Sequence, residues 1–172
     1  MMHISISPED LVDAAEGYSN TIFLFKAGQN RFGIFVPSRI TRPEGNEARR
    51  VHSIGTQGCF LFSLTHMVRI PYCGRAELRS RNTNGAETVQ IDLTQNVLRF
   101  GLGDLVIRES LNHCTSQLEN TFGFGIPDSF RTTLLAGEPT FHITACEIWV
   151  LDGLDSDNPA PREYVVDVLE KF

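Results

Sequence analysis

One carboxylate lies in the most apolar stretch of the chain. Aromatic and β-branched residues are frequent over positions 141–151, which predicts the longest strand of the protein. Alternation along that strand places Glu147 on one face with apolar side chains: Phe141, Ile143, Ala145, Trp149 and Leu151. We expect Glu147 to be partly buried and hydrogen-bonded. Replacing Glu147 by Ala would lower the free energy of unfolding by about 3 to 5 kcal/mol if Glu147 is half of a buried ion pair.

Three interpretations of Glu147 stay open. The residue could act as an acid or contact group in a functional site. It could instead form a structural ion pair with an arginine, or lie where the strand face opens to solvent. The two structural interpretations are the more common ones for such a residue.

Thiol chemistry is the second candidate. Cys59, Cys73, Cys114 and Cys146 are widely separated and form no C-x-x-C pair, so we expect free thiols in a reducing compartment. His113 precedes Cys114, but neighbours in an extended chain point apart. An ordinary loop cysteine is therefore favoured over a reactive thiol, and Cys59 and Cys146 are interpreted as small core residues.

The remaining chemical motifs are weak. The histidines, at positions 3, 52, 66, 113 and 142, do not cluster with other ligands at metal-binding spacing. Gly101 and Gly103 lie between two β runs and predict a tight turn rather than a phosphate-binding loop. Ser116, Thr121 and Phe122 are interpreted as loop anchors, Phe122 being the apolar plug. We predict no catalytic residue, metal or cofactor.

Composition limits the class of partner. The 172 residues carry a net charge of -6, which argues against binding nucleic-acid phosphates. Lys26 and Lys171 are the only lysines, and the arginines that supply the other positive charges favour protein interfaces. The start of the chain has no signal-peptide pattern and no run predicts a membrane span. We expect one cytoplasmic domain over residues 1–172.

Short strands separated by tight turns dominate the rest of the chain. Ser7 as N-cap and Pro8 after it predict a helix over 8–16, and a polar surface loop is expected over 37–56. Residues 109–139 predict an ordered irregular segment with a short helix at 128–135, whereas 152–172 permit either helix or strand at their end. The predicted strands are 21–25, 32–36, 59–64, 67–70, 88–93, 97–100 and 105–107.

Several segments, in order, resemble the TLDc domain of oxidation-resistance proteins. Residues 16–22 with Phe32 and Gly33 resemble its first hairpin, and residues 55–64 resemble its "FLFSL" strand. Residues 100–103 resemble its glycine turn, residues 105–122 align with its "G-x-S-x-x-C-x-T-F" run, and residues 147–149 match "E-v-W". At 108, 110, 114 and 119 the chain departs from the pattern with Arg, Ser, Cys and Glu. The resemblance is therefore to a divergent or N-terminally shortened member.

The resemblance implies a mainly β fold with minor α content: two antiparallel sheets packed as a β-sandwich and flanked by a few short helices. It implies a protein-binding module without an agreed active site, binding the vacuolar-type ATPase and linked to oxidative-stress resistance. A thiol-dependent antioxidant enzyme and a structural subunit of a cytoskeletal or ciliary assembly remain alternatives. The predicted binding residues are Gly101, Gly103, Ser116, Thr121, Phe122, Glu147 and Trp149, and the loops 37–56 and 109–124 are the expected contact surface.

Overall fold

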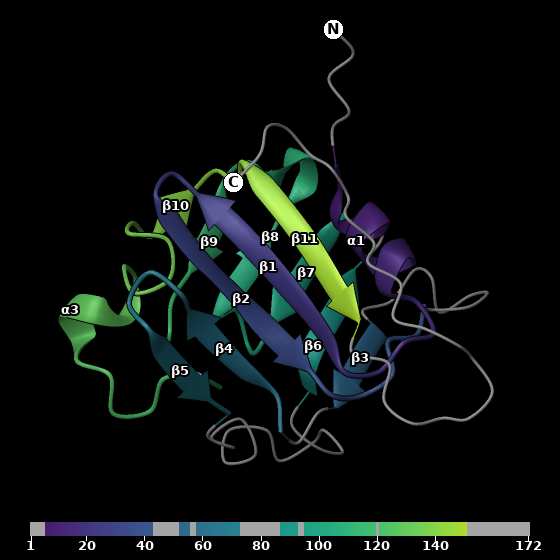
Figure 1. The fold of residues 1–172 in the computed structure, drawn as a ribbon, viewed down its shortest axis with the longest axis horizontal. Coiled ribbons are helices and arrows are strands. Elements are labelled where there is room, and N and C mark those ends of the chain that lie inside the picture. Colours follow the sequence, from purple (N-terminus) through teal and green to yellow (C-terminus); the bar gives the residue numbers. More distant parts are fainter. Residues whose placement is uncertain are drawn as a thin grey trace, which may run out of the picture.

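The computed structural model describes residues 6–42, 52–55, 58–72, 87–92, 95–119 and 121–150. Within these residues, strands build two antiparallel sheets that lie one behind the other (Figure 1). Side chains from both sheets meet between them. The predicted mainly β sandwich with few short helices is therefore confirmed.

The sheet nearer the viewer in Figure 1, here called the β1 sheet, has the described strand order β11-β1-β2-β4-β5. Its strands are β1 Thr21–Ala27, β2 Asn30–Val36, β4 Phe60–Ser63, β5 Val68–Pro71 and β11 Ala145–Val150. Strands β1 and β2 form the predicted hairpin. Pro71 ends β5 at the sheet edge, where its missing N–H breaks no ladder between strands.

The second sheet, here called the β7 sheet, has the described order β10-β9-β8-β7-β6-β3. Its strands are β3 His52–Gly55, β6 Glu87–Asp92, β7 Val97–Phe100, β8 Leu105–Ile107, β9 Cys114–Ser116 and β10 Thr140–Phe141. The predicted strands over 88–93, 97–100 and 105–107 are thus found with small shifts at their ends.

Helix α1, Pro8–Ala15, begins as its sequence predicts. The Ser7 hydroxyl accepts a bond from the Asp10 N–H, and the Asp10 carboxylate accepts one from the Ser7 N–H in return. Leu11, Val12 and Ala15 face the core beside β11 and β7. The helix therefore closes one open side of the sandwich (Figure 1).

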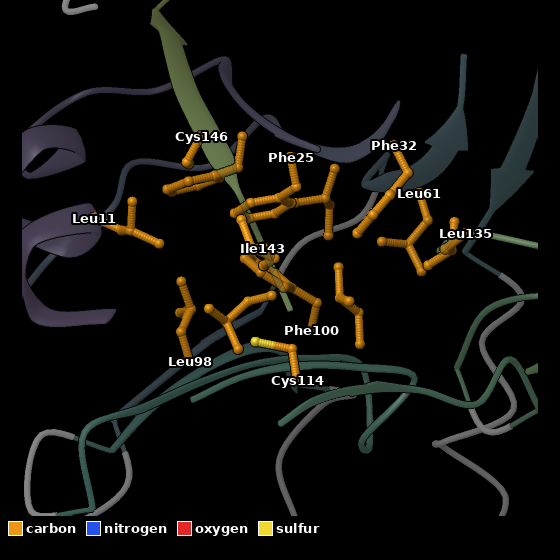
Figure 2. Packing of buried hydrophobic residues seen from close by; sticks show 14 of the residues in the cluster. Leu11, Phe25, Phe32, Leu61, Leu98, Phe100, Cys114, Leu135, Ile143 and Cys146 are labelled. Carbon is orange, nitrogen blue, oxygen red and sulfur yellow. The ribbon is translucent and has the colours of Figure 1, made fainter. Parts of the chain in front are cut away.

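Aromatic rings hold the two sheets together. Phe23 of β1 lies 5.7 Å from Phe100 of β7 between ring centroids, and Phe32 of β2 lies edge-on to Phe141 of β10 at 5.4 Å. Figure 2 shows Phe25, Phe32, Phe100 and Cys114 pointing into this shared layer. A single apolar core therefore spans both sheets.

Two predictions about irregular segments are wrong, and one predicted helix is found but is shorter. Residues 52–55 of the expected 37–56 loop form β3, because β6 offers them an antiparallel ladder. Residues 114–116 of the expected irregular segment form β9 between β8 and β10, and the helix predicted at 128–135 is only α3, Asp128–Arg131. Short strands depend on a partner far along the chain, which local patterns do not reveal.

The predicted long strand over 141–151 is also wrong, because the chain changes sheet within it. Strand β10 pairs with β9, and β11 pairs with β1. A short 3-10 helix, η2 Glu109–Leu111, supports the crossing, since its Leu111 carbonyl accepts from the Ile143 N–H at 3.0 Å. The expectations for Cys73 and for residues 152–172 lie outside the described residues. No helix among the described residues is long and apolar enough to span a membrane.

Candidate functional site

A buried carboxylate organises the predicted glycine turn. Asp104, fully buried between β7 and β8, accepts backbone N–H bonds from Glu119 at 3.0 Å, Thr121 at 2.9 Å and Phe122 at 3.2 Å. A carboxylate is able to accept this many bonds because both oxygens carry free lone pairs. Asp104 therefore fastens the 119–122 segment to the β7–β8 turn.

Gly101 and Thr121 complete this arrangement. A Cβ on Gly101 would lie 2.4 Å from the Asp104 carboxylate oxygen, and the residue has a φ of 68° that favours glycine. The Thr121 hydroxyl accepts the Leu102 N–H at 2.9 Å. Gly103 has a φ of 94° with open space around it, so backbone conformation alone requires glycine there.

Phe122 holds the 119–122 segment from another side, and Ser116 ties β9 to the residue that follows α3. Phe122 is fully buried, forms a backbone bridge with Tyr72 after β5, and meets the Tyr72 ring edge-on at 6.2 Å. The Ser116 hydroxyl bonds to the Thr132 carbonyl at 3.4 Å. We call Gly101, Asp104, Ser116, Thr121 and Phe122 the loop anchor. Its members contact each other or the body of the sandwich, as the anchoring interpretation predicts, and their role in binding stays a prediction.

Asp104 is the member of the loop anchor that sequence reasoning missed. Its signal was present: an acidic residue follows two glycines in a turn, where Asp commonly bonds to nearby backbone groups. Glu119, which stands where the family pattern has cysteine, contributes its backbone to the anchor. Its side chain instead reaches the Arg131 guanidinium at 3.4 Å.

Glu147 and Trp149 lie on the opposite face of their strand from the one predicted. In β11 the large buried side chains are Cys146, Ile148 and Val150, and the small Ala145 at its start is buried as well, whereas Glu147 is half-buried and Trp149 is 41% exposed. The crossing at residues 142–144, where Thr144 bonds back to the Lys26 carbonyl, shifts the alternation by one residue. The placement of Glu147 with Phe141 and Ile143 on one apolar face is therefore wrong.

Glu147 has a clear partner on this outer face. Its carboxylate accepts a hydrogen bond from the Trp149 indole N–H at 2.9 Å, and Leu24 of β1 lies opposite it in register. The partly buried, hydrogen-bonded state that we predicted is found. The acceptor bond is on a solvent-facing surface, so the interpretation of a strand face open to solvent fits best.

The described thiols are all in the interior. Cys59, Cys114 and Cys146 are buried, and none of the three forms a disulfide with another described residue. Burial raises the pKa of the Cys114 thiol, and it also raises the pKa of the Cys146 thiol, to which the Glu147 charge adds. The Cys114 thiol bonds to the Leu111 carbonyl at 3.4 Å, whereas His113 is exposed. Both environments disfavour the nucleophilic thiolate.

The outer side of the β1 sheet carries an apolar patch that sequence reasoning did not identify. Its members are half-buried or exposed, and we call them the outer apolar face: Ile22, Leu24, Phe35, Phe60, Phe62 and Trp149. A signal existed in Thr-Ile-Phe-Leu-Phe and Phe-Leu-Phe, where apolar residues occupy both faces of a strand in an antiparallel sheet. Among the residues described here, no three His, Cys, Asp or Glu gather as metal ligands.

The comparisons with known proteins agree with the fold. No curated protein matches the sequence. The family model of the TLDc domain matches residues 5–152, which include both sheets, the loop anchor and the Glu147–Trp149 pair. This span is most of the 172-residue chain. The chain therefore belongs to the TLDc domain family.

Proposed function

We propose that this chain is a non-catalytic protein-binding module whose partner is the vacuolar-type ATPase, and that it supports oxidative-stress resistance through that contact. Membership of the TLDc family supports the proposal. The resemblance to that family implies pump binding and oxidation resistance. The proposal implies work in the cytoplasm, at the surface of a membrane-bound complex. Fold membership alone does not assign a partner, so the partner requires direct measurement.

The observation that carries the binding interpretation is that the described thiols and the Asp104 carboxylate are buried, whereas an apolar surface is exposed. The Asp104 carboxylate and the Thr121 hydroxyl accept backbone bonds in the interior. The described thiols are buried, and burial raises the pKa of two of them. In contrast, the outer apolar face presents aromatic rings to solvent, which is typical of an interface.

Binding to the pump is tested with purified components. The full chain is labelled with a fluorescent tag and titrated with the soluble sector of the vacuolar-type ATPase. Albumin serves as the control protein. We expect saturable binding to the pump sector only. The proposed partner is wrong if the binding curve for the pump sector matches that for albumin.

A cysteine-free variant, compared with the unaltered chain, distinguishes a binding module from a thiol enzyme. A variant in which Cys59, Cys73, Cys114 and Cys146 are all replaced by Ala is checked for folding by circular dichroism. Both proteins are then assayed for peroxide consumption with dithiothreitol as reductant and for pump binding. We expect binding by both and turnover by neither, whereas catalytic turnover that disappears with the cysteines would contradict the proposal.

A further inference from the structure

Strand register aligns the outer apolar face into a row. Trp149 pairs with Ile22, Ile22 with Phe35, Phe35 with Phe60, and Phe60 with Pro71, so the row crosses every described strand of the β1 sheet. At strand spacings of about 4.8 Å it is roughly 19 Å long. The Phe35 and Phe60 rings lie 5.2 Å apart between centroids. The row is therefore a continuous apolar strip.

A second row lies beside it, one pleat further along the strands. Its register is Glu147, Leu24, Gly33, Phe62 and Arg69. A Cβ on Gly33 would lie 2.7 Å from the tip of the Phe62 ring, so that ring covers Gly33. The second row is apolar in its middle and carries one charge at each end.

The outer side of the β7 sheet differs in kind. The corresponding register there is Gln90, Arg99, Val106, Thr115 and Thr140, which is mostly polar, and Arg99 faces Asp92 at 3.8 Å. Antiparallel sheets usually present such polar residues to water. The apolar row is thus a property of one face of the sandwich. In Figure 1, the labelled helices α1 and α3 lie to the sides of the β1 sheet and not in front of it.

Positive charge accompanies the apolar strip. Lys26 and Arg31 pair in register beyond the second row, and the Arg69 guanidinium lies 4.1 Å from the centre of the Phe60 ring. Glu147 is the one acid in these five described strands, and Trp149 donates a bond to it. The net charge of the whole chain is -6, so this face is basic within an acidic protein.

We propose that the outer apolar face is the docking surface for an acidic amphipathic segment of a protein partner. Apolar side chains of that segment would lie on the two rows, and its carboxylates would face Lys26, Arg31 and Arg69. Exposed arginine beside aromatic rings is the composition of energetically important interface positions. A helix of about 13 residues matches the length of the row.

A membrane surface is the less favoured occupant. An anionic bilayer attracts basic patches but repels the remaining acidic surface of this chain, whereas a single acidic segment contacts only the basic face. This inference deepens the proposed binding function by assigning its surface, and it rests on that function.

Two synthetic probe peptides test the charge requirement. Both have about 14 residues and the same leucine stripe, with Glu at every polar position of one peptide and Lys at those of the other. Trp149, the only tryptophan of the chain, reports binding through its emission. We expect the acidic peptide to bind at least about tenfold more tightly than the basic one. Equal affinities would overturn the proposal.

Charge-reversal variants locate the binding surface. Arg31 and Arg69 are both exposed, so Arg31→Glu with Arg69→Glu should leave the fold intact and invert the peptide preference. Arg99→Glu on the β7 sheet is the matched control and should keep the original preference. Urea melts check that each variant is folded, and an unchanged preference in the double variant would overturn the proposal.

Other occupants give different results in the same assay. A change in Trp149 emission on adding phosphatidylserine vesicles, with no change on adding either peptide, would indicate that the face binds a membrane surface. Weak quenching of Trp149 emission by acrylamide in the protein alone would indicate that the face is already covered. If quenching increases on dilution, a second copy covers the face; if it does not change, the chain itself covers it. Each of these results overturns the assignment. If the pump sector binds the double variant as it binds the unaltered chain, the surface is wrong while the proposed function stands.

Discussion

At the scale of single residues, the best-defined group is a carboxylate that serves structure. Asp104 is fully buried and accepts N–H bonds from three residues of one loop. A buried backbone donor without an acceptor costs about 1 to 3 kcal/mol. One carboxylate therefore keeps the loop closed where short strands alone would not.

Replacing Asp104 by Ala should lower the free energy of unfolding by about 3 kcal/mol or more, because the buried N–H groups of Thr121 and Phe122 and the part-buried N–H of Glu119 lose their acceptor. Urea unfolding followed by circular dichroism measures the loss. Asp128→Ala is the control, since that side chain is 89% exposed and pairs with Arg131 at the surface. The control should change stability by less than about 0.5 kcal/mol. Similar small losses in both variants would contradict the anchoring role.

Cys146 should make stability depend on alkaline pH. Burial raises its pKa in the folded protein, whereas an unfolded thiol ionises with a pKa of about 8.5. Above that value only the unfolded state releases the proton, so the free energy of unfolding falls as pH rises. The expected slope is at most about 1.4 kcal/mol per pH unit for this thiol.

Urea melts between about pH 8 and pH 10.5 measure this slope, in the range where an unfolded thiol ionises. Cys146→Ala should show a shallower decline than the unaltered chain. The comparison uses slopes, because the packing lost with the sulfur lowers stability by the same amount at every pH. Parallel slopes would show that Cys146 does not contribute.

At the scale of elements, β2 depends on a residue without a side chain. A Cβ on Gly33 would lie 2.1 Å from the Phe23 carbonyl oxygen of β1, a backbone atom that cannot move aside independently. It would also meet the Phe62 ring of β4. The glycine lets three strands and the outer apolar face pack closely at this point.

Gly33→Ala should therefore destabilise the protein by about 3 kcal/mol, at the upper end of overpacking costs. Gly28→Ala in the β1–β2 turn is the control. A Cβ there has open space, and only the φ of 57° opposes it, which costs about 1 kcal/mol. Thermal melts of both variants provide the comparison. The prediction is contradicted if Gly33→Ala is no worse than Gly28→Ala.

At the scale of the whole molecule, the two sheets share one core. The Phe23–Phe100 and Phe32–Phe141 contacts each join a strand of the β1 sheet to a strand of the β7 sheet. Neither sheet buries its inner face without the other. We therefore expect both sheets to unfold in one transition.

Phe100→Ala tests this coupling, because the ring is fully buried between the sheets. It should cost about 3 to 5 kcal/mol. Trp149 emission, which reports the β1 sheet, and far-ultraviolet circular dichroism, which reports both sheets, should still shift together. Phe130→Ala, at a side chain that is 55% exposed, is the control and should have little effect. Separate transitions would show that the sheets fold independently.

The sequence by itself determined the local elements that carry strong signals. Ser7 and Pro8 define the start of α1, the aromatic runs define β1 and β2, and the family resemblance predicts the sandwich. These features depend on neighbours in the chain. The anchoring role of Thr121 and Phe122 was predicted from residues that match the family pattern, because the groups that hold them, Asp104 and Tyr72, are distant in the chain.

Tertiary structure decided the rest. Strands β3 and β9 exist because distant partners pair with them, and the orientation of Glu147 depends on a crossing between sheets. The outer apolar face forms only when register brings Trp149, Ile22, Phe35 and Phe60 into line. Period-two alternation tells which residues share a face within one strand. Which face meets the core is decided by pairing and by the packing of one sheet on the other.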